Sequence, residues 1–359
     1  MSELGRLEQE VLDVYKKVNP SEIRIEEEEV YEKWKQQREI LLIERLKLLP
    51  SAYQQTRLLE VGGGTGENTI LYSQWGADVT LVDFNPLALN RATYLWKRFG
   101  CSATRAIEAA VFDLPQIDLP TKSFDFVFCE GVIHHTEDPL QAVRIMLQYV
   151  KPGGILMLAF AEAFGIKARL LQRAYVEALA GRNENKIIAI AKEYFQEHLD
   201  RCVKFGRRSE LSVIYDSFVN PQILAIDLLE ITDQLHIHGF QYYSGSPELH
   251  FPYATAPYNQ PPIDIYDPRL NRQWVRHLQK HWLVCGRVSD EEKFMEAQGE
   301  NIQEEEKYLR LEQQIKSGGS NVSAQVLSMI QKGYLGVGLH YLVSLKTRKE
   351  CGCSWERQV

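Results

Sequence analysis

Four closely spaced glycines and one aspartate are the residues whose types and spacing most clearly predict chemistry. Gly62, Gly63, Gly64 and Gly66 follow one apolar run, and Asp83 ends the next one. Glycine reaches backbone angles that are closed to other residues and lets a ligand approach the main chain. Unpaired amides at the start of a following helix favour an anionic group, and an aspartate at a strand end can accept hydrogen bonds from ribose hydroxyls. The set therefore predicts a nucleotide-like ligand.

Two strands and one helix must position these residues. Residues 57–61 read as a strand that leads directly into the glycines, residues 67–75 as a helix, and residues 79–82 as a second strand that ends on Asp83. This order is the first half of a nucleotide-binding α/β unit. The dinucleotide pattern G-x-G-x-x-G would place its third glycine at Glu67, whereas the actual glycine is Gly66. The spacing therefore argues against NAD and FAD.

The segment 60–66, Glu-Val-Gly-Gly-Gly-Thr-Gly, resembles the E/D-x-G-x-G-x-G motif of class I S-adenosylmethionine-dependent methyltransferases. Residues 112–113, 123–139 and 151–158 continue the likeness and are similar to the branch that contains the ubiquinone and menaquinone C-methyltransferases. The resemblance covers roughly residues 55–162. It implies a Rossmann-like α/β fold with a mostly parallel seven-stranded sheet, N-terminal helices and a helical cap. S-adenosylmethionine would be the cofactor and S-adenosylhomocysteine the product.

The resemblance also assigns the cofactor site. The glycine backbone would bound the methionine part, Glu60 would hold the loop and the cofactor amine, and Asp83 would bind the ribose. Asp113 would accept a hydrogen bond from the adenine amino group beside Phe112, although aspartate also commonly caps turns. The residues expected to bind the cofactor are Glu60, Gly62, Gly63, Gly64, Gly66, Asp83, Phe84, Phe112, Asp113 and Glu130.

Three titratable residues follow another apolar strand, residues 124–129. Glu130, His134 and His135 should lie outside the carboxyl end of this strand, which is where open α/β sheets bind ligands. A histidine can remove a proton from a substrate hydroxyl or amine near neutral pH. The three residues are therefore the catalytic candidates. The alternative is that the paired histidines are present without both acting as bases, as is common in the resembling family.

The rest of the chain divides around this core. Residues 1–50 predict helices that either form a lid over the cofactor or merely pack on the sheet, and residues 51–165 form the cofactor-binding core. Residues 166–220 predict a helical cap on the substrate side. Residues 221–359 would complete the sheet, with an acidic helical insertion at about residues 290–316.

Aromatic and hydrogen-bonding side chains gather at residues 215–221. Tyr215, Asp216 and Asn220 are the candidates for contacts with the methyl acceptor. Basic cap residues could meet an acidic acceptor, or could instead be solvated: Lys167, Arg169, Arg173, Arg201, Lys204, Arg207 and Arg208. A helix is expected from residue 222 to about residue 238. For the last strand, residues 336–346 resemble the family's ending better than residues 282–288.

Composition bounds the class of protein. The chain has 359 residues, of which 45% are hydrophobic and 25% charged, as in soluble globular proteins. Its net charge of -7 argues against nucleic acid as the main partner, although a local basic patch could exist. No apolar run has the length of a membrane span, and the N-terminus lacks a signal-peptide core, so we expect a cytoplasmic protein. Cys351 and Cys353 do not have the usual zinc spacing, so no metal is expected.

Taken together, these features predict an enzyme that transfers a methyl group directly from S-adenosylmethionine to a small-molecule acceptor. Alignment of nucleophile, methyl and sulfur would supply much of the catalysis. Two alternatives stay open. One is a different transfer reaction from the same cofactor, and the other is a cofactor-binding regulatory or partner subunit that no longer catalyses. The sequence does not indicate an oligomeric state.

Overall fold

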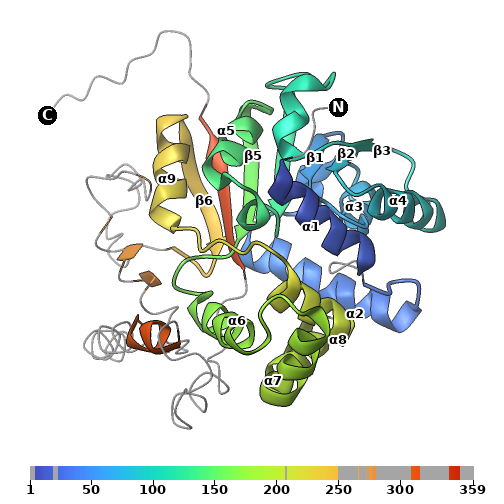
Figure 1. Cartoon of the computed structure of the whole chain (residues 1–359). Coiled ribbons are helices and arrows are strands. Elements are labelled where there is room, and N and C mark those ends of the chain that lie inside the picture. The colour runs from blue at the N-terminus through green and yellow to red at the C-terminus, as the bar shows by residue number, and fades with distance from the viewer. Residues whose placement is uncertain are drawn as a thin grey trace, which may run out of the picture.

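A seven-stranded sheet forms the centre of the protein (Figure 1). The computed structural model describes residues 5–18, 23–206, 208–249, 309–315 and 339–347, together with Tyr266, Arg272, Val275, Arg276, Leu278 and Gln279. The strand order is β3-β2-β1-β4-β5-β7-β6. The first five strands are mutually parallel, and β7 runs antiparallel to β5 and β6. The mostly parallel Rossmann-like sheet expected from the sequence is confirmed.

The bounds of the elements are as follows. The strands are β1 (Arg57–Val61), β2 (Asp78–Asp83), β3 (Thr104–Glu108), β4 (Phe124–Glu130), β5 (Val150–Phe160), β6 (Phe240–Ser246) and β7 (His340–Lys346). The helices are α1 (Arg6–Lys17), α2 (Glu28–Glu39), α3 (Glu67–Gln74), α4 (Pro86–Arg98), α5 (Pro139–Leu147), α6 (Lys167–Ala180), α7 (Glu184–Gly206), α8 (Glu210–Ile214) and α9 (Leu228–Ile237). Shorter 3-10 or π turns are η1 (Ile40–Arg45), η2 (Pro50–Tyr53), η3 (Val111–Gln116), η4 (Ile133–His135) and η5 (Tyr215–Val219).

Apolar layers cover both faces of the sheet. One layer contains α5, α9 and η3, and the other contains α3, α4 and the N-terminal residues Trp34 and Leu42. Strand β4 is almost wholly buried, with Asp125 and Glu130 as its partly exposed residues. A parallel strand that is covered on both faces needs such a continuous apolar run. The order of the strands reverses between β1 and β4, which is where open α/β sheets bind ligands.

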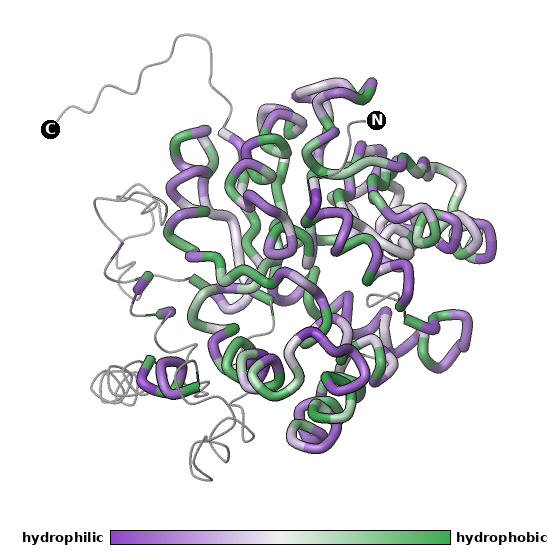
Figure 2. Tube along the Cα trace, viewed as in Figure 1, coloured by the Kyte–Doolittle hydropathy of each residue, from purple (hydrophilic) through white to green (hydrophobic). Residues whose placement is uncertain are grey.

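Helices α6, α7 and α8 with η5 form a cap at one end of the sheet (Figure 1). The cap has its own apolar cluster, which includes Leu171, Val176, Phe195 and Phe218. Its helices alternate between hydrophilic and hydrophobic residues along the chain (Figure 2), as expected when one face packs inward. A second core of this kind lets the cap hold its shape while its inner edge faces the sheet.

Several expected boundaries were wrong. The helix expected from residue 222 begins only at Leu228, because Ile226 forms an isolated parallel bridge with the segment that follows β5. The Ile226 amide donates to the Ala161 carbonyl, and the Ala163 amide donates to the Ile226 carbonyl. Apolar residues keep a helical spacing from residue 30 to residue 49, but the helix ends at Glu39 and the π turn η1 follows it. A strand was expected at residues 103–112, but β3 stops at Glu108, and residues 111–116 form η3.

The expectation for the last strand is confirmed, because β7 comes from the favoured segment 336–346. The competing segment 282–288 lies outside the described residues. Of the acidic insertion expected at 290–316, residues 309–315 are described and are helical. Among the described helices, none combines the length and the apolar character needed to cross a bilayer.

Candidate functional site

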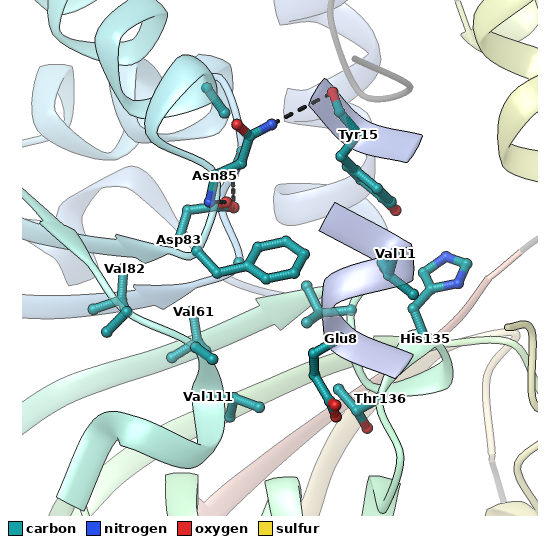
Figure 3. Close-up of a pocket in the computed structure, with 18 of the residues that line it drawn as sticks. Glu8, Val11, Tyr15, Val61, Val82, Asp83, Asn85, Val111, His135 and Thr136 are labelled. Atoms are coloured by element: carbon teal, nitrogen blue, oxygen red, sulfur yellow. Dashed lines mark hydrogen bonds between the residues drawn. The ribbon is translucent and has the colours of Figure 1, made fainter. Parts of the chain in front are cut away.

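A cavity opens at the point where the strand order reverses. The carboxyl ends of β1, β2 and β4 form its floor, and α1 crosses above it (Figure 3). Its lining residues are Glu8, Val11, Tyr15, Val61, Gly62, Gly64, Val82, Asp83, Phe84, Asn85, Ala88, Ala109, Ala110, Val111, Phe112, Glu130, Gly131, Val132, His135 and Thr136. Most of these side chains are apolar, and the polar ones are few, as in sites that bind small organic ligands.

The glycine loop after β1 could hardly be built from other residues. Gly62 has a φ of +71°, and a Cβ atom there would lie 2.2 Å from a methyl carbon of Val132. Gly66 has a φ of +73°, and its carbonyl accepts a hydrogen bond from the Trp96 indole at 3.1 Å. The loop therefore brings bare main chain to the cavity wall, which is the arrangement that lets a ligand approach the backbone.

Asp83 is fixed by the same loop. Its carboxylate accepts hydrogen bonds from the backbone amides of Gly64 and Asn85, both at 2.8 Å. Burial raises the pKa of Asp83 to about 6, while hydrogen bonds from the backbone amides of Asn85, Gly64 and Phe84 oppose the rise. A carboxylate has about four lone-pair sites, so acceptor capacity remains. Asp83 can therefore accept a hydrogen bond from a hydroxyl group in the cavity.

Glu60 and Gly63 stand behind the loop and do not line the cavity. The Thr69 hydroxyl donates a hydrogen bond to the Glu60 carboxyl, which is 3% exposed. Burial raises the pKa of Glu60 to about 8. The structure therefore places Glu60 where it supports the loop, and not where it faces the space above the glycines.

Glu130 reaches the cavity but is already paired. Arg38 on α2 donates to both of its carboxylate oxygens, at 2.8 Å from Nη1 to Oε2 and at a shorter distance from Nη2 to Oε1. The Tyr72 hydroxyl donates to Glu130 Oε1 at 3.0 Å, and the side chains of Arg38 and Glu130 are 9% and 12% exposed. The Glu130 carboxylate is thus committed to a buried ion pair, in which each charge depends on the other.

The side of the cavity nearest β3 is apolar. Phe84, Ala109, Val111 and Phe112 line it. Asp113 lies beyond them and lines an adjoining hollow that shares Phe84, Ala109 and Ala110 with the first. The structure thus brings Phe84 and Phe112 to the cavity with Asp83, and leaves Asp113 at its outer end.

Helix α1 covers the cavity. Glu8, Val11 and Tyr15 point into it, and the Asn85 amide donates to the Tyr15 carbonyl at 3.5 Å (Figure 3). Both carboxylate oxygens of Glu8 are buried without a hydrogen-bond partner. The end of α1 is tied to the cap, since Lys17 pairs with Glu184 at 2.9 Å. Of the two alternatives for the N-terminal helices, α1 has the position of a lid, whereas α2 packs on the sheet.

His135 lies between the cavity and the cap. Its Nδ1 atom is 2.6 Å from the Gln222 carbonyl, which can only accept, so Nδ1 carries a proton. In the neutral ring, Nε2 then has a free lone pair. That atom is 3.8 Å from the Asp216 carboxylate, which is too far for a hydrogen bond but near enough to stabilise a positive charge. Burial lowers the pKa of His135, and Asp216 partly opposes this.

His134 does not line the cavity. Its ring packs on that of His135 at 4.1 Å between centroids, and its Nδ1 atom is buried without a hydrogen-bond partner. Burial lowers the pKa of His134 well below its usual value. The two histidines therefore differ, because only His135 presents a ring nitrogen between the cavity and a carboxylate.

The three acceptor candidates lie on the cap side. Although burial alone would raise it, the pKa of Asp216 is lowered to about 2 by Arg208, at 3.1 Å, and by His135. Tyr215 donates to Glu184 and thereby joins the tether between α1 and the cap. Asn220 is fully buried, and its Oδ1 accepts from the Gln222 amide at 3.1 Å.

Sequence reasoning missed Glu8, Arg38 and Asn85. A signal existed for the first two, because each is a charged residue on the apolar face of its helix. Arg38 follows Trp34 by four positions, and Glu8 precedes Val11 by three. From the sequence, neither helix was predicted to do more than form a possible lid.

Comparison with known proteins gives a consistent family. A family model described as a methyltransferase domain matches residues 33–201. An uncharacterised protein of Synechococcus sp. is 30% identical over 161 residues, which is 43% of this chain and 37% of the relative. The tRNA 5-carboxymethoxyuridine methyltransferase of Escherichia coli is 28% identical over 115 residues, covering 32% of this chain and 43% of the relative.

A third relative, the ubiquinone biosynthesis O-methyltransferase of Bordetella avium, is 32% identical over 117 residues. The match covers 32% of this chain and 46% of the relative. The chain therefore spans less than half the length of each of these relatives. The segment that the family model matches, residues 33–201, includes the glycine loop and the strands that form the cavity floor.

Proposed function

We propose, from the premise that residues 33–201 form a class I S-adenosylmethionine-dependent methyltransferase domain, that the protein methylates a hydroxyl group of a small molecule. The observation that carries this proposal is the placement of His135 between the cavity and Asp216. A donor site alone would not need a histidine with a free lone pair at this border. A methyl acceptor that must lose a proton does.

The cavity fits the donor on three counts. Asp83 offers remaining acceptor capacity for the ribose hydroxyls, and Phe84, Val111 and Phe112 supply apolar surface for a base. The main chain at Gly62 and Gly64 leaves room that a side chain would fill. When bound there, S-adenosylmethionine supplies an electrophilic methyl group on a positively charged sulfur.

The residues of this chain then have separate tasks. The Gln222 carbonyl holds the Nδ1–H of His135, so that Nε2 can take the proton of an acceptor hydroxyl. The new oxygen–carbon bond forms as the carbon–sulfur bond breaks, and S-adenosylhomocysteine leaves. Asp216 stabilises the imidazolium that results, since its charge lies 3.8 Å from Nε2. Helix α1 would exclude water from the reacting groups.

A small-molecule acceptor is favoured over nucleic acid by where the charge lies. The net charge of the chain is -7, and phosphate backbones are usually bound by exposed basic surfaces. The cap arginines nearest His135, namely Arg169 and Arg173, are partly buried at the inner edge of the cap. They could bind a group that enters the site but not a backbone that passes over the surface.

The proposal is tested first on the donor. Isothermal titration with S-adenosylhomocysteine should show saturable binding, and Asp83→Ala should weaken it by a hundredfold or more. Incubation with methyl-labelled S-adenosylmethionine and a metabolite extract should then give labelled product. Tight donor binding without any labelled product would indicate a non-catalytic subunit instead, and unchanged binding by Asp83→Ala would remove Asp83 from the site.

A further inference from the structure

Buried donor groups without partners gather where the cap meets the core. Arg173 Nη1 and Asn220 Nδ2 are both buried, and neither donates a hydrogen bond to any acceptor in the described part of the chain. Asn220 is fully buried, and the hydrogen bond from the Gln222 amide to Oδ1 identifies the other side-chain atom as the amide nitrogen. An unpaired buried donor is costly, so two in one place indicate a missing ligand.

The two groups are held side by side. Arg173 donates through Nη2 to the Asn220 carbonyl at 2.5 Å, whereas its Nη1 atom has no hydrogen-bond partner within the described residues. Two residues later, the Gln222 carbonyl holds His135. A single short segment, residues 220–222, thus carries the unpartnered amide, fixes the guanidinium and orients the imidazole that borders the donor cavity. Two residue steps span at most about 7 Å of main chain, so the amide donor and the carbonyl that holds the imidazole belong to one small region.

The charges around these groups favour an anion. Arg169, Arg173 and Arg208 all act on the buried cluster of Asp216 and the two histidines. Arg208 is paired with Asp216, whereas Arg169 forms no ion pair or hydrogen bond within the described residues. Asp216 is the cluster's buried carboxylate, and its charge is taken up by Arg208. Arg173 is also acted on by Glu177, which is exposed. The buried part of the region therefore keeps an excess of positive charge, which an anion would reduce.

We propose that Arg173 Nη1, Asn220 Nδ2 and Arg169 form an anion-binding subsite that takes a carboxylate of the methyl acceptor. The acceptor class is then a small hydroxy-carboxylic acid, whose hydroxyl meets His135 while its carboxylate meets the two arginines. A planar guanidinium suits the two oxygens of a carboxylate. This inference rests on the proposed function for the role of the hydroxyl, but the subsite itself is independent of methyl transfer.

The test uses two probes of the same shape and different charge, benzoate and benzamide, titrated calorimetrically into the protein saturated with S-adenosylhomocysteine. Benzoate should bind at least tenfold more tightly than benzamide. Arg173→Gln, which shortens the side chain and removes its charge, should reduce benzoate to the affinity of benzamide. Asn220→Asp keeps the acceptor for the Gln222 amide but replaces the free donor with an anion, and should have the same effect.

Matched variants separate this subsite from general charge and from misfolding. Arg182→Gln removes an exposed arginine from the same cap and should leave benzoate binding unchanged. Arg173→Lys should recover part of the preference for benzoate, and the affinity for S-adenosylhomocysteine should be the same in all variants. Equal binding of benzoate and benzamide by the native protein, or a loss in Arg182→Gln as large as in Arg173→Gln, would overturn the proposal.

The outcome is distinguishable from a failure of the proposed function. If the protein binds benzoate as described but S-adenosylhomocysteine does not bind, the subsite stands and the methyltransferase reading falls. If S-adenosylhomocysteine binds and methyl label is transferred equally to hydroxy acids and to their carboxamides, the acceptor class is wrong while the reaction is right.

Discussion

Two parts of the site differ in how their polar groups are satisfied. The cradle, made by the carboxyl ends of β1, β2 and β4, pairs Asp83 with backbone amides and Glu130 with Arg38. The cover, made by α1 and the cap, leaves Glu8, Arg173 and Asn220 with buried atoms that have no partner. The carboxylates of the cradle are therefore paired before ligands arrive, although Arg38 Nε is itself buried without a partner. The cover, in contrast, presents one carboxylate and two donors that a ligand could satisfy.

The largest difference between the two parts is expected in stability, when one arginine is removed from each. Arg38→Met leaves Glu130 buried without its partner, so we expect the free energy of unfolding to fall by about 3–5 kcal/mol. Arg173→Met removes a single hydrogen bond to a carbonyl and one of several like charges, so we expect a loss of no more than about 1.5 kcal/mol. Urea unfolding of the ligand-free variants measures both.

The double variant Arg38→Met, Glu130→Gln serves as the control, because it removes the orphaned charge along with its partner. It should recover part of the stability that Arg38→Met loses. Equal losses in the free energy of unfolding for Arg38→Met and Arg173→Met would mean that internal contacts stabilise the cover as much as they stabilise the cradle.

The cradle was largely predictable from the sequence and the cover was not, for a physical reason. The glycine loop and Asp83 follow directly from adjacent strands, so spacing along the chain is spacing in the fold. The contacts of the cover join distant residues, for example Lys17 to Glu184, which are 167 positions apart. Periodicity indicates which face of a helix is buried, but it does not say what that face will meet.

Two expectations show the limit. Glu130 was named as a catalytic and cofactor-binding candidate, and its ion pair with an arginine 92 positions earlier was not anticipated. The segment 222–227 was expected to be helical, yet its amides bond to residues of the core instead, such as Leu224 to the His134 carbonyl. In both cases a long-range partner decided the outcome, and no local pattern records it.

The next largest effect is expected on kcat, from a change of His135, which lies between the cradle and the cover. His135→Asn keeps a donor for the Gln222 carbonyl but has no basic lone pair, so kcat for the labelled acceptor should fall by about a hundredfold. The affinity for S-adenosylhomocysteine should change by less than about threefold. Steady-state kinetics and calorimetry give the two quantities separately.

The matched change His134→Asn should lower kcat far less, because His134 does not line the cavity. Raising the pH should restore part of the activity of His135→Asn, since an acceptor hydroxyl that is already ionised needs no base. A fall of the same size in both variants, without recovery at high pH, would assign the histidines a structural task.

The pH dependence of donor binding tests the cradle alone. With the pKa of Asp83 at about 6, its ionised fraction falls from about nine-tenths at pH 7 to about one-tenth at pH 5, so affinity for S-adenosylhomocysteine should fall about tenfold. The protein should not unfold through this group over that range. A raised pKa means that protonation favours the folded state, so this group's contribution to stability is greatest below pH 4 and is lost as the pH rises through 6.

Calorimetric titrations at pH 5, 6 and 7 on the native protein and on Asp83→Asn separate this group from other buried carboxyls. Glu60 and Glu67, whose pKa values burial raises to about 8 and about 7, remain in the variant. The weaker binding of Asp83→Asn should be nearly independent of pH. The same tenfold fall in the variant would trace the effect to another residue.

The smallest effect should be one of selectivity, and it concerns the lid. Glu8 brings a buried carboxylate without a partner to a cavity whose proposed donor is positively charged and whose product is not. Glu8→Gln keeps the shape and removes the charge, so it should weaken binding of S-adenosylmethionine by about fivefold while binding of S-adenosylhomocysteine changes by less than twofold. Glu10→Gln, on the outer face of the same helix, is the control and should change neither. Equal weakening of both ligands by Glu8→Gln would show that α1 covers the donor by shape alone, whereas a selective loss would mean that the lid holds the donor more tightly before methyl transfer than after it.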